Sequence, residues 1–164
     1  MKNTAITFEY EVPTLAEFQD RMHSTMQKYP YIVIEKDGVI AGYAYAGALK
    51  NRAAYNWSCE MTVYLDHNAQ KCGLGRMLYE EMERRLGRMG ILNLYACIGY
   101  PETEDEYLTN NSTEFHAHLG YKRVGEFRNS GYKFGRWYHM VWMEKIIGEH
   151  RENQPDVIFA GNNI

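Results

Sequence analysis

The residues with the clearest chemical potential form a short run with two glycines, Gln70-Lys71-Cys72-Gly73-Leu74-Gly75, followed by Arg76. Gly73 and Gly75 lack a Cβ, so the backbone at these positions is able to approach a ligand closely. Apolar residues recur with helical spacing behind the run, and a helix N-terminus presents unpaired N–H groups and the positive end of its dipole. The arrangement predicts an anion site, with a phosphate or pyrophosphate as its natural occupant.

Spacing excludes two common nucleotide-binding motifs. A Walker A loop requires a longer gap between its glycines and then Lys-Ser/Thr. A dinucleotide fingerprint, G-x-G-x-x-G, requires a third glycine where Leu78 stands. For the two glycines alone, a plain strand-to-helix connection is an equal alternative. The full string Q-x-x-G-x-G is more specific, because it follows a predicted strand that ends in Val63-Tyr64-Leu65.

Glu60 is the main candidate for acid–base chemistry. It stands in an otherwise apolar or aromatic stretch, next to Met61 and three residues after Trp57. An ionised carboxylate in such a stretch must be paired, face a wet cleft or have a raised pKa. A raised pKa suits a general base that takes a proton from an ammonium group. The alternatives are a Glu that faces solvent at a strand edge and a Glu paired with Arg52.

The histidines and cysteines are less informative by themselves. His116 and His118 lie on a short predicted helix, where a lone His is more often a packed or surface residue. The chain has three cysteines, Cys59, Cys72 and Cys97, at no metal-ligand spacing. They are therefore expected to be free thiols, and no metal site is predicted. No nearby His marks one of them as a nucleophile.

The elements that must position these residues alternate between helix and strand. Thr14 and Glu17 form a capping box that predicts a helix, which Tyr29-Pro30 ends, and Asp37-Gly38 predicts a hairpin turn. Strands are expected at 31–36, 39–46, 53–65 with a bulge near 59–61, 91–98, 122–127 and 137–146, and further helices at 74–89 and 112–119. The order predicts one α+β sheet domain over residues 1–147, followed by a polar, aperiodic tail over residues 148–164.

Bulk properties exclude several classes of function. The 164 residues carry a net charge of -3 and no dense basic run, which argues against nucleic-acid binding. No apolar run approaches the roughly 18–20 residues of a transmembrane helix, and the N-terminus does not resemble a signal peptide. A cytoplasmic protein with no membrane partner is predicted.

In its Q-x-x-G-x-G string the chain resembles the pyrophosphate loop of the GNAT acyl-CoA N-acyltransferases. Three further strings resemble one branch of that family, the phosphinothricin and methionine sulfoximine acetyltransferases, and so does the helix end His116–Tyr121. The three strings are RAAYNW at 52–57, EMTVY at 60–64 and GYKFGRW at 131–137. The resemblance covers about residues 29–145. It implies a GNAT-like fold with a central, mostly antiparallel sheet flanked by helices, N-terminally shortened by the branch's first strand and helix.

The resemblance also implies a function and site residues. It implies an N-acetyltransferase that moves the acetyl group of acetyl-CoA directly, without an acyl-enzyme, to the amine of a small amino-acid-like acceptor. A homodimer is expected. Glu60 takes the position of the general base, and His116 that of the acid for the CoA thiolate. The expected cofactor contacts are Met61, Thr62, Val63, Gln70, Lys71, Cys72, Gly73, Leu74, Gly75, Arg76 and Asn111.

The pantetheine and acceptor contacts are assigned by position. The branch's pantetheine-contacting Asn falls on Thr109, so Asn110 or Asn111 is expected to substitute. Arg52 is expected to clamp the acceptor carboxylate, with Tyr55 and Lys133 lining the acceptor site.

Because the missing N-terminal pair lines the acceptor side in the branch, two alternatives stay open. One is an acyl-CoA-binding module with little activity. The other is a partner-dependent subunit whose exposed sheet edge pairs with another chain.

Overall fold

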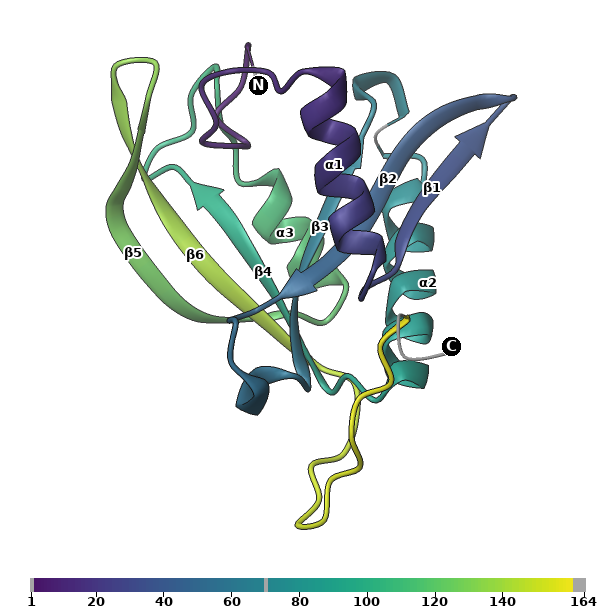
Figure 1. Cartoon of the computed structure of the whole chain (residues 1–164). Helices are drawn as coiled ribbons and strands as arrows, with labels where there is room; N and C mark the ends of the chain where they lie inside the picture. Colours follow the sequence, from purple (N-terminus) through teal and green to yellow (C-terminus); the bar gives the residue numbers. More distant parts are fainter. Residues whose placement is uncertain (1, 70, 161–164) are drawn as a thin grey trace. The chain divides into compact units, whose positions relative to one another are not determined.

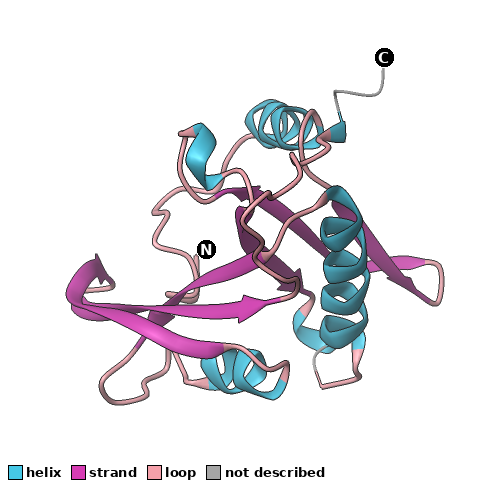
Figure 2. Cartoon of the chain, turned by 90° about the horizontal axis from the view of Figure 1, so that it is seen from below, coloured by secondary structure: helices cyan, strands magenta, loops and turns pink. Residues whose placement is uncertain are grey.

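The computed structural model describes residues 2–69 and 71–160 of the 164-residue chain (Figure 1). The described residues form three α-helices and six β-strands, shown by type in Figure 2. They fall into two compact units. Among the described residues, the first unit holds those from Phe18 to Leu94 and from Ile146 to Ala160, and the second holds those up to Glu17 and from Tyr95 to Lys145. No helix within the described residues is long and apolar enough to cross a membrane.

The first unit is built on three antiparallel strands in the order β1 (Tyr31–Lys36), β2 (Val39–Ala48) and β3 (Ser58–Leu65). Asp37 and Gly38 join β1 to β2 with φ of 54° and 78°, the left-handed pair that a tight hairpin turn requires. The predicted hairpin is therefore confirmed. Helix α2 (Leu74–Met89) packs against these strands.

Helix α1 (Leu15–Met26) begins at the predicted capping box. The Thr14 N–H donates to Glu17 Oε2 at 2.7 Å, and the Glu17 N–H donates back to Thr14 Oγ1 at 3.3 Å. This reciprocal pair satisfies two backbone donors that the helix itself leaves open. The predicted start of the helix is confirmed.

The long strand predicted over residues 53–65 is wrong in its first part. Ala53–Tyr55 form a 3-10 turn, and β3 begins only at Ser58. The Tyr55 and Asn56 N–H groups donate to the carbonyls of Arg52 and Ala53, so this stretch closes on itself. The predicted bulge near residues 59–61 is absent from the β2–β3 ladder, which runs without a register shift.

The second unit contains α3 (Asn111–His118), β5 (Lys122–Lys133) and all but the end residues of β4 (Asn93–Tyr100) and β6 (Arg136–Ile146), with β6 between the other two strands. The β5–β6 hairpin is longer than predicted and carries a register shift between Phe127 and Gly131. An added Cβ on Gly131 would clash with the Phe8 ring. Gly131 therefore lets the N-terminal segment pack closely on the hairpin.

Candidate functional site

Glu60 shares one face of the β1–β2–β3 sheet with Thr62 and Tyr64, because side chains alternate along a strand. Its direct partner in the ladder is Gly47 on β2, and directly opposed residues point to the same face. An added Cβ on Gly47 would meet no atom within 4 Å. The half-buried Glu60 carboxylate therefore stands beside open space.

Of the three possibilities that the sequence left open for Glu60, its surroundings favour a raised pKa. Burial raises the pKa of the Glu60 carboxyl above its usual value, and the nearby Lys50 ammonium opposes part of this effect. The alternative pairing with Arg52 is not found: the Glu60 carboxylate has no hydrogen bond or ion pair within residues 2–69 and 71–160. An unpaired carboxylate with a raised pKa is suited to proton abstraction.

The loop between β2 and β3 provides a recess in the same unit. Lys50, Asn51, Arg52 and Tyr55 line a volume of about 360 Å³. The 3-10 turn brings Arg52 and Tyr55 together, two residues that the sequence assigned to the acceptor. Lys50 was not assigned, although its position two residues before Arg52 was a signal for a second cation. The recess therefore combines two cations with an aromatic hydroxyl.

The predicted anion turn is a left-handed backbone segment at the start of α2. Lys71 and Gly73 have φ of 59° and 80°, and Gly73 occupies the N-cap position. Gly73 has no side chain with which to cap the helix, and among the described residues no side-chain cap takes its place, so the first N–H groups of α2 are open to an outside partner. Gln70 lies outside the described residues.

The other residues of the turn differ in exposure. Lys71 and Cys72 are exposed, Leu74 is half-buried and Gly75 is buried in the first turn of α2. The exposed Arg76 guanidinium lies 3.9 Å from the Glu80 carboxylate, an i,i+4 surface pair that leaves its charge accessible. On β3, Met61 is buried, and Thr62 and Val63 are half-buried in the ladder to β2.

In the second unit, His116 is buried on α3, with 3% of its surface exposed. Its Nδ1 lies 2.6 Å from the Ser112 carbonyl oxygen, which only accepts, so Nδ1 carries the proton and Nε2 a lone pair in the neutral ring. Burial lowers the pKa of His116, and the Ser112 hydrogen bond opposes this effect. The ring meets Phe115 and Tyr121 edge-on. His118 is exposed.

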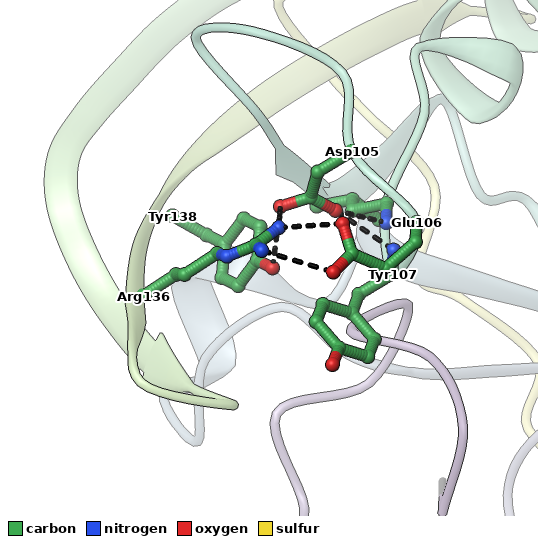
Figure 3. A network of polar contacts seen from close by, with 6 residues as sticks. Asp105, Glu106, Tyr107, Arg136 and Tyr138 are labelled. Atoms are coloured by element: carbon green, nitrogen blue, oxygen red, sulfur yellow. Dashed lines mark hydrogen bonds and ion pairs between the residues drawn. The ribbon is translucent and has the colours of Figure 1, made fainter.

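The acidic loop before α3 is held by a network around Asp105 (Figure 3). Asp105 Oδ1 accepts the N–H groups of Tyr107 and Leu108, both at 2.8 Å. Its Oδ2 accepts the Tyr138 hydroxyl at 2.8 Å and lies 2.9 Å from Arg136 Nη1. The sequence identified only an acidic loop, because the partners of Asp105 on β6 are some thirty positions away along the chain.

The network leads into the first turn of α3. Glu106 accepts both Nη groups of Arg136, at 2.8 and 2.9 Å, and Glu104 Oε1 accepts the Asn110 N–H at 2.7 Å. Asn111 is exposed at the first position of α3. The Oδ1 atom of Asn110 is buried and has no hydrogen-bond partner in the part of the chain that the structure describes. An orphaned buried amide oxygen of this kind accepts a donor from a ligand readily.

Lys133 does not line the recess, unlike Arg52 and Tyr55, the other two predicted acceptor residues. It is buried, with 2% of its surface exposed, and its Nζ donates to the carbonyls of Thr7 and Glu9 at 2.7 and 2.8 Å. Burial lowers the pKa of Lys133, and the charge of Glu9 opposes this effect. The ammonium therefore holds the N-terminal segment, whereas Arg52 and Tyr55 line the recess of the first unit.

Within the described residues, no three His, Cys, Asp or Glu side chains are grouped so as to hold a metal ion. A family model described as an acetyltransferase (GNAT) domain matches residues 1–142. The chain is 34% identical, over 88% of its length and 75% of the relative's, to phosphinothricin N-acetyltransferase of Streptomyces viridochromogenes. It is 30% identical to L-methionine sulfoximine/L-methionine sulfone acetyltransferase of Salmonella typhimurium, over 74% and 67% of the two chains.

A solved structure shows a similar fold. The GNAT superfamily phosphinothricin acetyltransferase from Sinorhizobium meliloti, in complex with AcCoA, is 30% identical and aligns with a TM-score of 0.83. The alignment covers 97% of this chain and 83% of the other.

Proposed function

This chain belongs to the GNAT acetyltransferase family, and from that premise we propose that it moves the acetyl group of acetyl-CoA to the amine of a small amino-acid-like acceptor. The GNAT fold predicted from the sequence is confirmed by the structural similarity. The acyl donor is acetyl-CoA, with which the similar Sinorhizobium meliloti enzyme was solved. The acceptor class follows the phosphinothricin and methionine sulfoximine enzymes that the chain resembles.

The observation that carries the proposal is the placement of Glu60. An unpaired, half-buried carboxylate with a raised pKa lies beside the open space above Gly47, and Lys50 is close enough to act on its charge. Lys50 also lines the recess with Arg52 and Tyr55. A zwitterionic acceptor fits this arrangement, because the cations of the recess attract its carboxylate while Glu60 receives a proton from its ammonium group.

The proposed reaction is a direct transfer. Glu60 takes the ammonium proton, and the neutral amine nitrogen forms a bond to the acetyl carbonyl carbon as the carbon–sulfur bond breaks. The electron pair of that bond leaves on the CoA sulfur, which then receives a proton. His116 is assigned this last step. Because its Nδ1–H is directed at Ser112 and Nε2 carries the lone pair, Nε2 takes up the second proton, which the amine nitrogen loses as the amide forms, and delivers it to the sulfur.

For acetyl-CoA, the residues present fit a pyrophosphate at the start of α2. Gly73 leaves the first N–H groups of the helix uncapped, and Lys71 and Arg76 add positive charge beside them. Gln70, Cys72, Leu74 and Gly75 complete this proposed contact set. The backbone of Met61, Thr62 and Val63 is proposed for the pantetheine arm.

The amide that contacts the pantetheine arm is proposed to come from the start of α3. Asn111 is retained from the sequence, and the orphaned Oδ1 of Asn110 makes that residue its alternative. Lys133 is retained in the acceptor set as the residue that holds the N-terminal segment.

A cytoplasmic homodimer that binds neither nucleic acid nor membrane is proposed as the working form. The second unit exposes large apolar side chains on β5 and β6, which supports association. These are Val124, Phe127, Tyr132 and Trp137, between 47% and 61% exposed. Size-exclusion chromatography coupled to light scattering tests the oligomeric state. A monomer mass at all working concentrations contradicts the dimer.

Acetyl transfer to a panel of amino acids tests the proposed function. The panel contains phosphinothricin, methionine sulfoximine and the proteinogenic amino acids, and thiol release is measured with acetyl-CoA present. Mass spectrometry then locates the acetyl group. The proposal expects N-acetylation of at least one panel member, and a folded, CoA-binding protein that acetylates none of them contradicts it.

A further inference from the structure

The C-terminal segment from Gly148 was predicted as a tail, and it contains no helix or strand up to residue 159. It nevertheless packs on the first unit, and Figure 1 shows it returning to the end of α2. The Ile158 N–H donates to the Met89 carbonyl at 2.8 Å, Val157 is buried, and the Phe159 ring meets the Tyr29 ring edge-on. The segment is therefore a docked part of this unit.

Two side-chain hydrogen-bond routes connect the segment with the start of β3. The Trp57 indole N–H donates to the Pro155 carbonyl at 2.8 Å. His150 Nε2 lies 2.9 Å from Asn93 Oδ1, and Asn93 Nδ2 donates to Ser58 Oγ at 3.2 Å. Both routes end on adjacent residues, Trp57 and Ser58. These lie between the recess and Glu60 in the sequence.

The main chain of Trp57 is fixed as well. Its carbonyl oxygen accepts the N–H groups of Leu92 and Asn93, at 2.9 and 3.0 Å, and the Leu92 carbonyl accepts the Ile147 N–H at 2.8 Å. The residue is thus held at its carbonyl and at its indole, from two different segments. The 3-10 turn with Arg52 and Tyr55 ends just before it, and Glu60 follows three residues later.

We propose that the docked C-terminal segment is a clamp that acts through Trp57, a positioning residue that fixes the recess loop relative to Glu60. The inference rests on the proposed function, because it takes the recess as the acceptor site. Catalysis depends on holding the acceptor amine at contact distance from the base, so small displacements of the loop reduce the rate. The clamp sets acceptor binding and leaves acetyl-CoA binding unchanged.

The test uses Trp57→Phe, which removes the indole N–H and keeps an aromatic ring. Since Pro155 is exposed, water replaces the lost donor and the protein is expected to fold. The Michaelis constant for the acceptor should rise about fivefold to tenfold, the equivalent of one hydrogen bond, while that for acetyl-CoA stays within about twofold. Arg151→Ala is the matched control, because the Arg151 side chain pairs within the segment, with Glu149, and with no other described residue.

A second variant, ending at Gly148, removes the clamp. If the clamp acts through Trp57, Trp57→Phe has no further effect on the acceptor constant in the shortened chain. Three results overturn the proposal. The first is that the effects of Trp57→Phe and of the shortening on the acceptor Michaelis constant add up. The others are that Trp57→Phe raises the constants for acceptor and acetyl-CoA equally, or that Arg151→Ala raises the acceptor constant as much as Trp57→Phe does. Where the shortened chain does not fold, Trp57→Phe and its control decide the question.

Hydrogen exchange separates this inference from the proposed function. In Trp57→Phe the amides of Tyr55, Asn56, Leu92 and Asn93 should exchange about fivefold to tenfold faster than in the native chain, whether or not an acceptor is turned over. Unchanged exchange at all four amides contradicts the clamp. An absence of acetylation by the native chain contradicts only the proposed function.

Discussion

Gly47 lies directly opposite Glu60 in the β2–β3 ladder, and a Cβ added to Gly47 would have no atom within 4 Å. The two residues therefore form a carboxylate with an empty neighbouring position. All the remaining residues of β2 from Tyr43 to Ala48 carry a side chain. We propose that an acceptor amine reaches the Glu60 carboxylate through this open position.

Gly47→Leu tests that relationship. The added side chain fills the space beside Glu60, so kcat/KM for the acceptor should fall about tenfold or more, while the Michaelis constant for acetyl-CoA is unchanged. Stability should not fall, because a strand favours a larger residue over glycine where there is room. Gly125→Leu on β5 is the control, since that glycine also has no atom within 4 Å of an added Cβ. Equal effects of the two substitutions on acceptor turnover would exclude a specific role for Gly47.

Glu60→Gln should stabilise the protein at neutral pH while removing activity. Burial raises the pKa of Glu60 in the folded state, so the wild-type carboxyl contributes stability below its unfolded value, near 4.5, and loses it as pH rises through the folded value. The neutral amide avoids this loss. Thermal unfolding from pH 4 to 8 should show a higher Tm for the variant at pH 7–8, with the difference shrinking toward pH 4. A constant difference across the range contradicts the raised pKa.

Gly73→Ala tests the turn at the start of α2. Its φ of 80° costs an alanine about 1–2 kcal/mol, and relief of that strain displaces the first N–H groups of the helix. Isothermal titration should show acetyl-CoA binding weakened about fivefold to thirtyfold. Gly38→Ala is the matched control, because Gly38 has φ of 78° and equally open space but lies in the β1–β2 hairpin. This control variant should lose stability but keep its affinity for acetyl-CoA. If Gly73→Ala binds acetyl-CoA with normal affinity, the turn is not part of the acetyl-CoA site.

Asp105→Asn tests the network that holds the loop before α3. The Asp105 pKa is lowered overall: burial raises it, but Arg136, Tyr138 and the loop N–H groups outweigh that effect. A lowered folded pKa contributes stability above the unfolded value, near 3.8, that is lost as pH falls through the folded value. The substitution should cost about 1–3 kcal/mol at pH 7 and flatten the loss of stability on acidification.

Glu102→Gln, an exposed residue of the same loop, is the control for this substitution and should leave the unfolding free energy unchanged. The comparison is made by urea denaturation at pH 7 and at pH 3. If Asp105→Asn unfolds like its control at pH 7, the network does not hold the loop.

Local sequence signals predicted the local structure well. The Thr14–Glu17 box, the Asp37-Gly38 turn and the apolar stripe of α2 act over a few residues, and all three elements formed as predicted. The error at residues 53–57 arises where the local 3-10 turn is followed by non-local contacts. Trp57 pairs with Leu92, Asn93 and Pro155, residues whose proximity no local pattern reveals.

The candidate site shows the same division. Glu60 and the turn at Gly73 were predicted from residue type and spacing together with the resemblance of the strings around them, and their roles stay predictions. Lys133 was assigned by resemblance, and its engagement with the Thr7 and Glu9 carbonyls depends on a contact more than a hundred positions away. The Asp105–Arg136 network was missed for the same reason.

The role of Glu60 as general base is tested most directly by the pH dependence of kcat/KM for the acceptor, measured for the native chain and Glu60→Gln. The native profile should rise through the raised pKa of Glu60, and the variant should lack that limb and be slower by about 10²–10⁴-fold. A variant that retains the acid limb and reacts within about threefold of the native rate would contradict the account, because general-base catalysis contributes far more than that.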